Sequence, residues 1–325
     1  MKRRTFTGLA LAGLAMCAAP AASMADTYPS RPVKLVVGFA PGGATDVLAR
    51  AIATRLGAKY PSGVIVENRT GAGGTIAANV VAKAQPDGYT LAFASTGAFS
   101  IAPSLYSNLQ YDPQQDFTPV ALVAQATYVL VVNPKLPVGN VAEFVSYAKA
   151  NGDKLSYGSF GNGSVSHLLA ELLKSATGTQ AQHIPYGGSP AMAMATISGE
   201  VAYSLDTLQS ALPHIRAGKV RALAVVAAKR SSVAPDIPTF AEQGVKGLDL
   251  QNWFGVVGPA GMPKDIAEQL GRDIDAVVAE PAFKELCSSQ GADAAQATGA
   301  AFGTFLKDQQ ERWGDLARQS GARIE

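Results

Sequence analysis

Residues 33–56 read VKLVVGFAPGGATDVLARAIATRL, in which a β-branched run leads into a glycine-rich loop and then into a helical pattern. The run 33–39 has the composition of a buried strand. From Val47 to Leu56 apolar residues recur at the spacing of one helix face, and Asp46 lies in the first turn, where the helix dipole favours an acid. The stretch therefore predicts a strand, a loop and a helix in the order that builds parallel α/β sheets.

The same order recurs along the chain. Residues 64–67 and 89–94 predict further strands, each followed by glycine, serine, threonine or asparagine, and 155–158 predicts a short strand before a leucine-rich helix. The sequence therefore predicts an α/β fold throughout.

Two long β-branched runs predict how the chain is divided. Residues 120–132 form a run longer than a typical strand, and a second run starts at residue 220. If each run crosses between domains, residues 26–125 and 227–325 form domain 1 and residues 126–226 form domain 2. The prediction is a two-lobed α/β protein, joined by two strand crossovers, with a ligand cleft between lobes that close around a small molecule.

Residues 1–25 predict an export signal, because three basic residues precede an apolar run at 9–19 and small residues follow it. Cleavage after Ala25 or after Ser23 fits, and Arg3-Arg4 leaves the twin-arginine route open beside the Sec route. A lipid anchor at Cys17 is an alternative, but the residue before it is not small. The remaining chain is long enough for two domains and is predicted to be periplasmic.

The charge and cysteine content exclude some classes of protein. The formal net charge is +2 and three cations belong to the predicted signal, so the mature chain is near neutral and has no basic run for nucleic acid. Only Cys287 remains after the signal, so no intrachain disulfide can form, and a buried thiol is expected.

Two glycine-rich loops, residues 39–46 and 158–167, are predicted to lie where a strand ends and a helix begins. Ligands of open α/β sheets bind at this edge, and the open N–H groups of a helix N-terminus attract an anion. A tight turn at Asp46, an N-cap at Ser164 and a structural role for His167 are the alternatives. Candidate ligand-binding residues are Phe39, Gly42, Gly43, Thr45 and Asp46 in the first loop, and Ser159, Gly161, Gly163, Ser164 and His167 in the second.

Other candidates follow other predicted strands. Thr75 follows a glycine-rich strand end, Ser95 follows the strand 89–94, and Asp206 follows the strand 201–205 and is expected to point into the crevice. Asp206 with Gln209 is also a capping box, which is the alternative for that acid. Four aromatic residues are candidates for the cleft wall, and a place in the core is the alternative for each of them; they are Phe39, Phe160, Tyr186 and Trp253.

Enzymatic motifs are missing from the sequence. The G-x-S-x-G elbow is absent, and at the nearest match, Gly187 to Ala191, a helix that starts with a Ser189 cap and Pro190 explains the serine better. The phosphate-binding G-x-x-x-x-G-K-[ST] is absent, and the histidines show no metal-ligand spacing. We therefore predict no catalytic residue, metal or cofactor. A secreted hydrolase that pairs Ser159, Ser164 or Ser189 with a histidine is the alternative.

Short motifs along the mature chain resemble one family, the Bug-type (Bordetella uptake gene) periplasmic solute-binding receptors of tripartite tricarboxylate transporters. The motifs are residues 28–33, Pro41-Gly42-Gly43 with Asp46, residues 66–69, 86–91, Tyr157-Gly158-Ser159 with Gly163-Ser164, His167-Leu168, residues 183–186 and 217–223. The sequence departs from the family pattern at 37–40, where the approach is less proline-rich, and at Thr70, where proline is common.

The resemblance implies a receptor that binds a small carboxylate, either a di- or tricarboxylate, an amino-acid-like acid or an aromatic acid. It implies that the carboxylate lies against residues 42–46 and 159–164, with Asp206 and ordered waters completing the cleft. The expected partners are integral membrane transporter subunits, and the expected receptor is a monomer. A receptor that presents its ligand to a membrane sensor is the alternative with the same sequence pattern.

Overall fold

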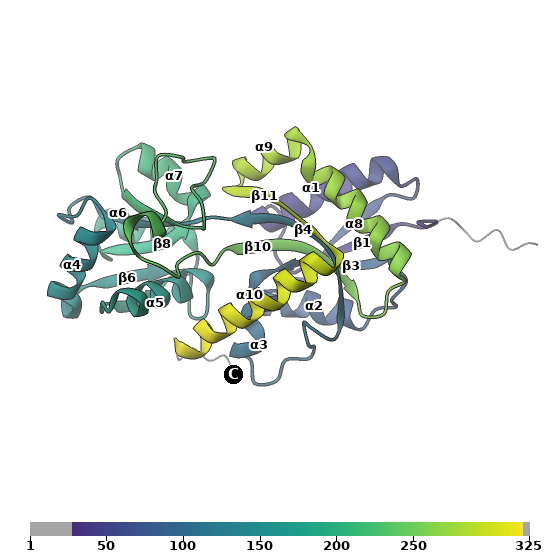
Figure 1. Ribbon diagram of the computed structural model, residues 1–325, viewed down its shortest axis with the longest axis horizontal. Helices are drawn as coiled ribbons and strands as arrows, with labels where there is room; N and C mark the ends of the chain where they lie inside the picture. Colours follow the sequence, from purple (N-terminus) through teal and green to yellow (C-terminus); the bar gives the residue numbers. More distant parts are fainter. Residues whose placement is uncertain (1–27, 321–325) are drawn as a thin grey trace, which may run out of the picture.

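The computed structural model describes residues 28–320, and Figure 1 shows two lobes joined by long strands. The predicted export signal lies outside the described residues. Two separate sheets, of six and five strands, form the centres of the lobes. The predicted two-lobed α/β architecture is therefore confirmed.

The first lobe is built on a mixed sheet in the order β11-β4-β10-β3-β1-β2, in which β1, β2 and β3 are parallel and β10 and β11 pair antiparallel with their neighbours. Its strands are β1 (Val33–Val37), β2 (Val64–Asn68), β3 (Thr90–Ser95), β4 (Phe117–Ala126), β10 (Asn252–Pro259) and β11 (Ala292–Thr298).

Helices cover both faces of this sheet (Figure 1). Apolar side chains of α1 (Ala44–Lys59), α8 (Lys264–Ala279) and α9 (Pro281–Ser289) share one core, which also buries the Cys287 thiol as expected. The other face packs against α2 (Thr75–Ala82) and α10 (Gly299–Gln319).

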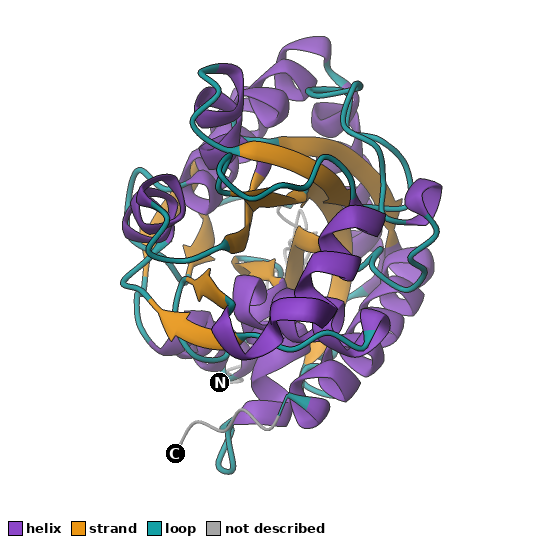
Figure 2. Cartoon of the chain, turned by 90° about the vertical axis from the view of Figure 1, so that its left-hand side faces the viewer, coloured by secondary structure: helices purple, strands orange, loops and turns teal. Residues whose placement is uncertain are grey.

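The second lobe is built on a sheet in the order β7-β6-β8-β5-β9. Figure 2, which views the molecule from this end, shows helices surrounding the strands. The strands are β5 (Tyr128–Val132), β6 (Ser156–Ser159), β7 (Gln182–Pro185), β8 (Tyr203–Thr207) and β9 (Arg221–Val226); the helices are α4 (Val141–Asn151), α5 (Val165–Thr177), α6 (Ser189–Ser198) and α7 (Leu208–Arg216).

Short helices complete the chain. In the first lobe, η1 (Ala72–Gly74) follows β2, and η2 (Gly97–Ile101), a π-helix, and α3 (Ala102–Leu105) follow β3. Two further short helices are η3 (Gly152–Lys154), which follows α4, and η4 (Ala241–Gln243), which lies between β9 and β10. None of the helices within residues 28–320 has the length and apolarity needed to cross a membrane.

The chain first passes between the sheets at Thr127, where β4 ends and β5 begins, so the long run 120–132 crosses as predicted. The run from residue 220 does not itself carry the chain back, because β9 lies in the second sheet, inside the predicted domain 2, and pairs with β5. Residues 227–251 then pack on the second lobe through Phe240, Leu248 and Leu250. The chain returns at the start of β10, so we propose that 227–251 belong to the second lobe.

Candidate functional site

A cleft of about 460 Å³ lies between the lobes, and loops from both of them line it. Residues at the ends of β1, β3 and β6 contribute to it, so it lies at the edge of the sheets where ligands of α/β proteins bind. Its lining residues are Phe39, Thr45, Ala72, Gly73, Ser95, Gly97, Ile101, Ala102, Leu105, Tyr106, Tyr128, Phe160, Asn162, Gly163, Ser164, Val165, Asn252 and Phe254.

The loop between β1 and α1 leaves several backbone donors open. Gly42 has a φ of 88°, which favours glycine, and the extended Gly43 is the N-cap of α1. The N–H groups of residues 43–46 have no acceptor within residues 28–320, as expected of the first turn of a helix. Thr45 lines the cleft beside these groups, so this helix N-terminus is suited to an anion.

Asp46 holds this loop in shape. One carboxylate oxygen accepts hydrogen bonds from the Gly42 N–H (2.9 Å) and Arg50 Nε (2.8 Å), and the other accepts from Asn68 Nδ2 (2.8 Å). Burial acts to raise the pKa of Asp46, but these hydrogen bonds outweigh it and lower the pKa to about 2. The side chain is 2% exposed and does not line the cleft, so Asp46 is a positioning residue.

Two hydroxyl groups at the cleft, on the largely buried residues Ser95 and Thr45, lie near the same loop. Ser95 is 5% exposed and Thr45 is 9% exposed, and neither side chain has a hydrogen-bond partner in the described part of the chain. Neither hydroxyl is among the fully buried side-chain atoms without a partner, so both are accessible from the cleft to a ligand or to water. Thr75 differs, because its hydroxyl donates to the Ala72 carbonyl (3.0 Å) and it does not line the cleft.

The loop between β6 and α5 satisfies most of its own donors. Ser164 is the N-cap of α5, as its alternative interpretation predicts; its hydroxyl accepts from the His167 N–H (3.3 Å) and donates to the Gly161 carbonyl (2.7 Å). The Gly161 N–H donates to Ser159 Oγ (3.1 Å), and the Gly163 N–H donates to His167 Nδ1 (3.1 Å). The N–H groups of Asn162, Val165 and Ser166 and the side-chain amide of Asn162, which lines the cleft, have no partner within residues 28–320, so this loop also leaves donors open.

A stack of rings supports the second loop from beneath. The His183 ring is stacked against both His167 and Tyr157, with centroid distances of 4.0 and 4.9 Å, and its Nε2 lies 2.6 Å from Ser159 Oγ. Burial, together with the neighbouring His167, lowers the pKa of His183 to about 4. Ser159 is fully buried, so a substrate cannot reach its hydroxyl. This serine–histidine pair therefore gives no support to the hydrolase alternative.

The His183 pKa predicts a loss of stability in acid. His183 titrates near 6.5 when exposed and near 4 when folded, so between these values the unfolded chain binds more protons. Stability is therefore fully present above pH 6.5 and falls as the pH drops towards 4. We expect His183→Gln to flatten this dependence in urea denaturation at pH 7.5 and 5.0. His214→Gln, on α7 and outside the stack, should keep it; a full wild-type dependence in the His183 variant would contradict the assignment.

Asp206 lies beneath the cleft surface, because it is 1% exposed and does not line the cleft. Burial raises its pKa to about 6, although hydrogen bonds from Ser189 Oγ (2.9 Å) and the Thr207 N–H (2.7 Å) act in the opposite direction. The alternative capping box with Gln209 is wrong, since Thr207 is the N-cap of α7 and accepts from the Ser210 N–H. Ser189 is the first residue of α6 and not its cap.

The predicted site residues therefore fall into three groups. Those that line the cleft are Phe39, Thr45, Ser95, Gly163 and Ser164; those that shape its two loops from behind are Gly42, Gly43, Asp46, Ser159, Gly161 and His167; those elsewhere are Thr75, Tyr186 and Asp206. Tyr186 donates to Glu200 (2.8 Å), and Trp253 is a core residue whose indole donates to Ser100. Phe160 lines the cleft, as its wall interpretation predicts.

Several cleft residues were not predicted. Tyr128 begins β5 directly after the crossing, so its position at the cleft follows from the crossing itself. Ile101, Leu105 and Tyr106 come from the short helices after β3, which have no regular apolar period. Phe254 lies opposite Ser95 in the sheet, a register that only the pairing of β10 with β3 reveals.

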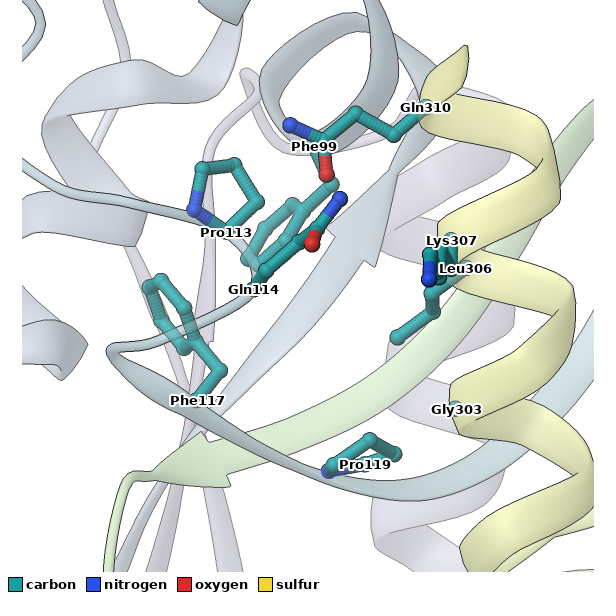
Figure 3. Close-up of a pocket in the computed structure, with 9 residues that line it drawn as sticks. All are labelled: Phe99, Pro113, Gln114, Phe117, Pro119, Gly303, Leu306, Lys307 and Gln310. Carbon is teal, nitrogen blue, oxygen red and sulfur yellow. The ribbon is translucent and has the colours of Figure 1, made fainter. Parts of the chain in front are cut away.

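A separate hollow of about 210 Å³ lies in the first lobe beneath α10 (Figure 3). Phe99, Phe117 and Leu306 form its apolar part, and Lys307 and Gln310 lie at its side. None of the predicted site residues lines it. Within residues 28–320 no cluster of three or more histidine, cysteine or acidic side chains is placed to hold a metal ion.

Comparison with known proteins assigns relatives to this chain. The model of the "Tripartite tricarboxylate transporter family receptor" matches residues 48–322. The chain is 36% identical to the protein BugT of Bordetella pertussis over 301 residues, which is 92% of each chain.

Solved structures of relatives have the same fold. The chain is similar to the periplasmic binding protein BugD, with 36% identity and a TM-score of 0.74 over 92% of this chain and 100% of that one. It is similar to the R. palustris protein Rpa4515 with adipate (36% identity, TM-score 0.78, 91% and 100% covered). It is also similar to MatC from Rhodopseudomonas palustris with bound malate (32% identity, TM-score 0.74, 89% and 100% covered).

Proposed function

Because the chain belongs to the tripartite tricarboxylate transporter receptor family, we propose that it binds a small carboxylate in the interlobe cleft and delivers it to the membrane subunits of a secondary transporter. The chain is a solute-binding receptor and not an enzyme. We further propose that residues 1–25 direct it to the periplasm by the Sec or twin-arginine route, and that it acts there as a monomer.

One observation carries the proposal: the N-terminus of α1 presents the open N–H groups of residues 43–46 beside the hydroxyls of Thr45 and Ser95, which line the cleft. A carboxylate has two oxygens that accept several hydrogen bonds, and each charge-assisted bond contributes about 1.5 to 3 kcal/mol. A few such bonds are enough for micromolar binding. Relatives that bind adipate and malate support a carboxylate ligand.

The two chain crossings support a closing motion. Thr127 and the start of β10 are adjacent, since Asn252 pairs with Ala126, so the lobes are connected at one edge of the cleft. Rotation about these crossings changes the distance between the two glycine-rich loops while each lobe keeps its own core. We propose that the closed form around the solute is the form that the transporter subunits recognise.

Thermal shift of the mature protein, refolded after removal of bound solute, tests carboxylate binding. The panel holds mono-, di- and tricarboxylates, each with its amide. An acid at 100 times its dissociation constant adds about 2.7 kcal/mol of stability and raises the midpoint by several degrees. We expect a shift with at least one acid and not with its amide. A panel in which no acid exceeds its amide would refute the proposed function.

Ala44→Pro tests where the carboxylate binds. Ala44 is the first residue of α1 and the preceding Gly43 is extended (φ −76°, ψ 166°), so proline fits both the helix start and the residue before it. The variant loses one N–H donor only. We expect binding of the acid found in the panel to weaken about 10- to 100-fold in calorimetry at unchanged thermal stability. Ala44→Ser keeps the N–H and should bind as the wild type does; equal affinity of the proline variant would exclude this donor.

A further inference from the structure

The hollow beneath α10 lies in the first lobe and shares no lining residue with the interlobe cleft. The loop before β4 contributes Pro113 and Gln114 to one side of it, and α10 contributes Leu306 and Gln310 to the other side (Figure 3). A molecule of about 210 Å³ or less can therefore occupy the hollow whatever the cleft binds.

Aromatic side chains form the floor of the hollow. Phe99 and Phe117 are buried in the core of the first lobe, and their rings meet edge to face with centroids 4.8 Å apart. Pro113, Pro119 and Leu306 add apolar surface around them. An apolar cavity of about 150 Å³ holds a benzene molecule, so the hollow has room for one aromatic ring with a small head group.

Three polar side chains at the hollow have no partner. The ammonium group of Lys307 and the amides of Gln114 and Gln310 make no hydrogen bond or ion pair within residues 28–320. Lys307 is the one charged side chain among the described residues that line the hollow, so no acid there neutralises it. Ammonium and amide N–H groups donate hydrogen bonds to an anion, and an apolar pocket with a few polar groups around it is the usual form of a ligand site.

Gly303 leaves space at the hollow at a cost to α10. It lies inside a helix of 21 residues, where glycine is less favourable than alanine. A Cβ atom added there would lie 3.4 Å from Pro119, an ordinary contact distance, and the backbone of Gly303 is not left-handed. Neither close packing nor backbone conformation therefore requires glycine at this position, whereas an open hollow does.

The floor of the hollow and the wall of the cleft share one helix. Phe99 belongs to η2, and Gly97 and Ile101 of the same helix line the cleft. This segment is a π-helix, a conformation that occurs frequently at functional sites. A molecule that packs on Phe99 therefore contacts a helix that also forms part of the cleft.

We propose that the hollow is a second ligand site, which binds a small aromatic monoanion with its ring on Phe99 and Phe117 and its charged group beside Lys307. The apolar floor supplies most of the affinity, because an ion pair with an exposed lysine contributes little. The lysine and the two amides select an anion over a neutral molecule of the same shape.

Ligand-detected NMR of the mature protein at pH 7.5 and low salt tests the charge preference. Benzoate and benzamide have the same ring and differ in charge. We expect benzoate to bind, and Lys307→Glu to weaken its binding about 10-fold while changing benzamide binding by less than about 2-fold. Lys284→Glu reverses an exposed cation on α9, outside both cavities, and should leave both affinities unchanged. Absence of benzoate binding, or equal weakening by the two charge reversals, would overturn the proposal.

Gly303→Leu tests the location of the bound ring. Benzoate is also a carboxylate that can enter the cleft, so the titration is made in the Thr45→Asp background, in which the added acid repels anions from the cleft. We expect benzoate binding to persist in this background and to weaken at least 10-fold when Gly303→Leu fills the hollow, at a similar thermal midpoint. Loss of benzoate binding with Thr45→Asp alone would place the ring in the cleft and overturn the second site, while leaving the proposed function standing. Benzoate binding that Gly303→Leu does not weaken would also overturn it.

Discussion

Replacing Thr45 by aspartate is expected to weaken binding of the carboxylate solute more than 100-fold while leaving the fold intact. Thr45 is the second residue of α1, lines the cleft, and has no side-chain partner within residues 28–320. An acid in the first helical turn is favourable, so the helix should tolerate it. Its carboxylate would lie beside the N–H groups of residues 43–46. Two like charges about 4 Å apart repel by about 4 kcal/mol at the effective dielectric of a protein surface, which exceeds the 2.7 kcal/mol that corresponds to 100-fold.

Two variants make this measurement specific. Thr45→Asn has nearly the size of the aspartate without its charge, so it should weaken binding far less in the same calorimetric titration. Ser164→Asp adds the same charge to the second loop and keeps a good N-cap, and we expect a loss at least 10-fold smaller than that of Thr45→Asp. Equal losses at both positions would mean that both loops contact the carboxylate.

The positions of the two loops could be predicted because they depend on local sequence. A β-branched run, a glycine-rich segment and a helical period succeed one another at residues 33–56, and the structure places β1 and α1 there. The same holds for β6 and α5, including the Ser164 cap. In an α/β protein the strand end is also the ligand edge, so the pattern locates the cleft.

What each loop leaves open could not be predicted from local sequence. The Gly163 N–H is used by His167, and His167 is held in place by His183, a residue on another strand. The cleft residues Ile101, Leu105 and Tyr106 come from short helices without a period, and the cleft position of Phe254 depends on the register between β10 and β3. The run from residue 220 was predicted to cross for a similar reason, because a buried edge strand such as β9 has the same β-branched composition as a crossing strand.

Asp46→Ala is expected to lower the free energy of unfolding by about 3 kcal/mol. The substitution removes the acceptor that the Gly42 N–H and the Asn68 amide share in a partly buried loop, and a polar group left unpaired in such a position costs about 1 to 3 kcal/mol. The solvated Arg50 guanidinium keeps its hydrogen bond to Asn68 Oδ1 and adds nothing to this loss. Urea denaturation at pH 7 measures the loss. Asp87→Ala removes an ion pair with Arg31 in which both side chains are well exposed, and should change stability by less than about 1 kcal/mol. A comparably small effect at Asp46 would exclude its role as the support of the loop.

The pH dependence of stability separates the contribution of the Asp46 charge from the contribution of the side chain's size and packing. The pKa of this carboxyl falls from 3.8 to about 2 on folding, so its charged form contributes stability that is fully present above pH 3.8 and is lost as the pH falls towards 2. Asp46→Asn should be less stable than the wild type at pH 5, and the two curves should converge between pH 4 and 2. This window lies below that of His183. The loss between pH 6.5 and 4 that His183→Gln removes is therefore the part that arises at the second loop. The loss below pH 4 that Asp46→Asn removes is the part that arises at the loop that we propose binds the carboxylate.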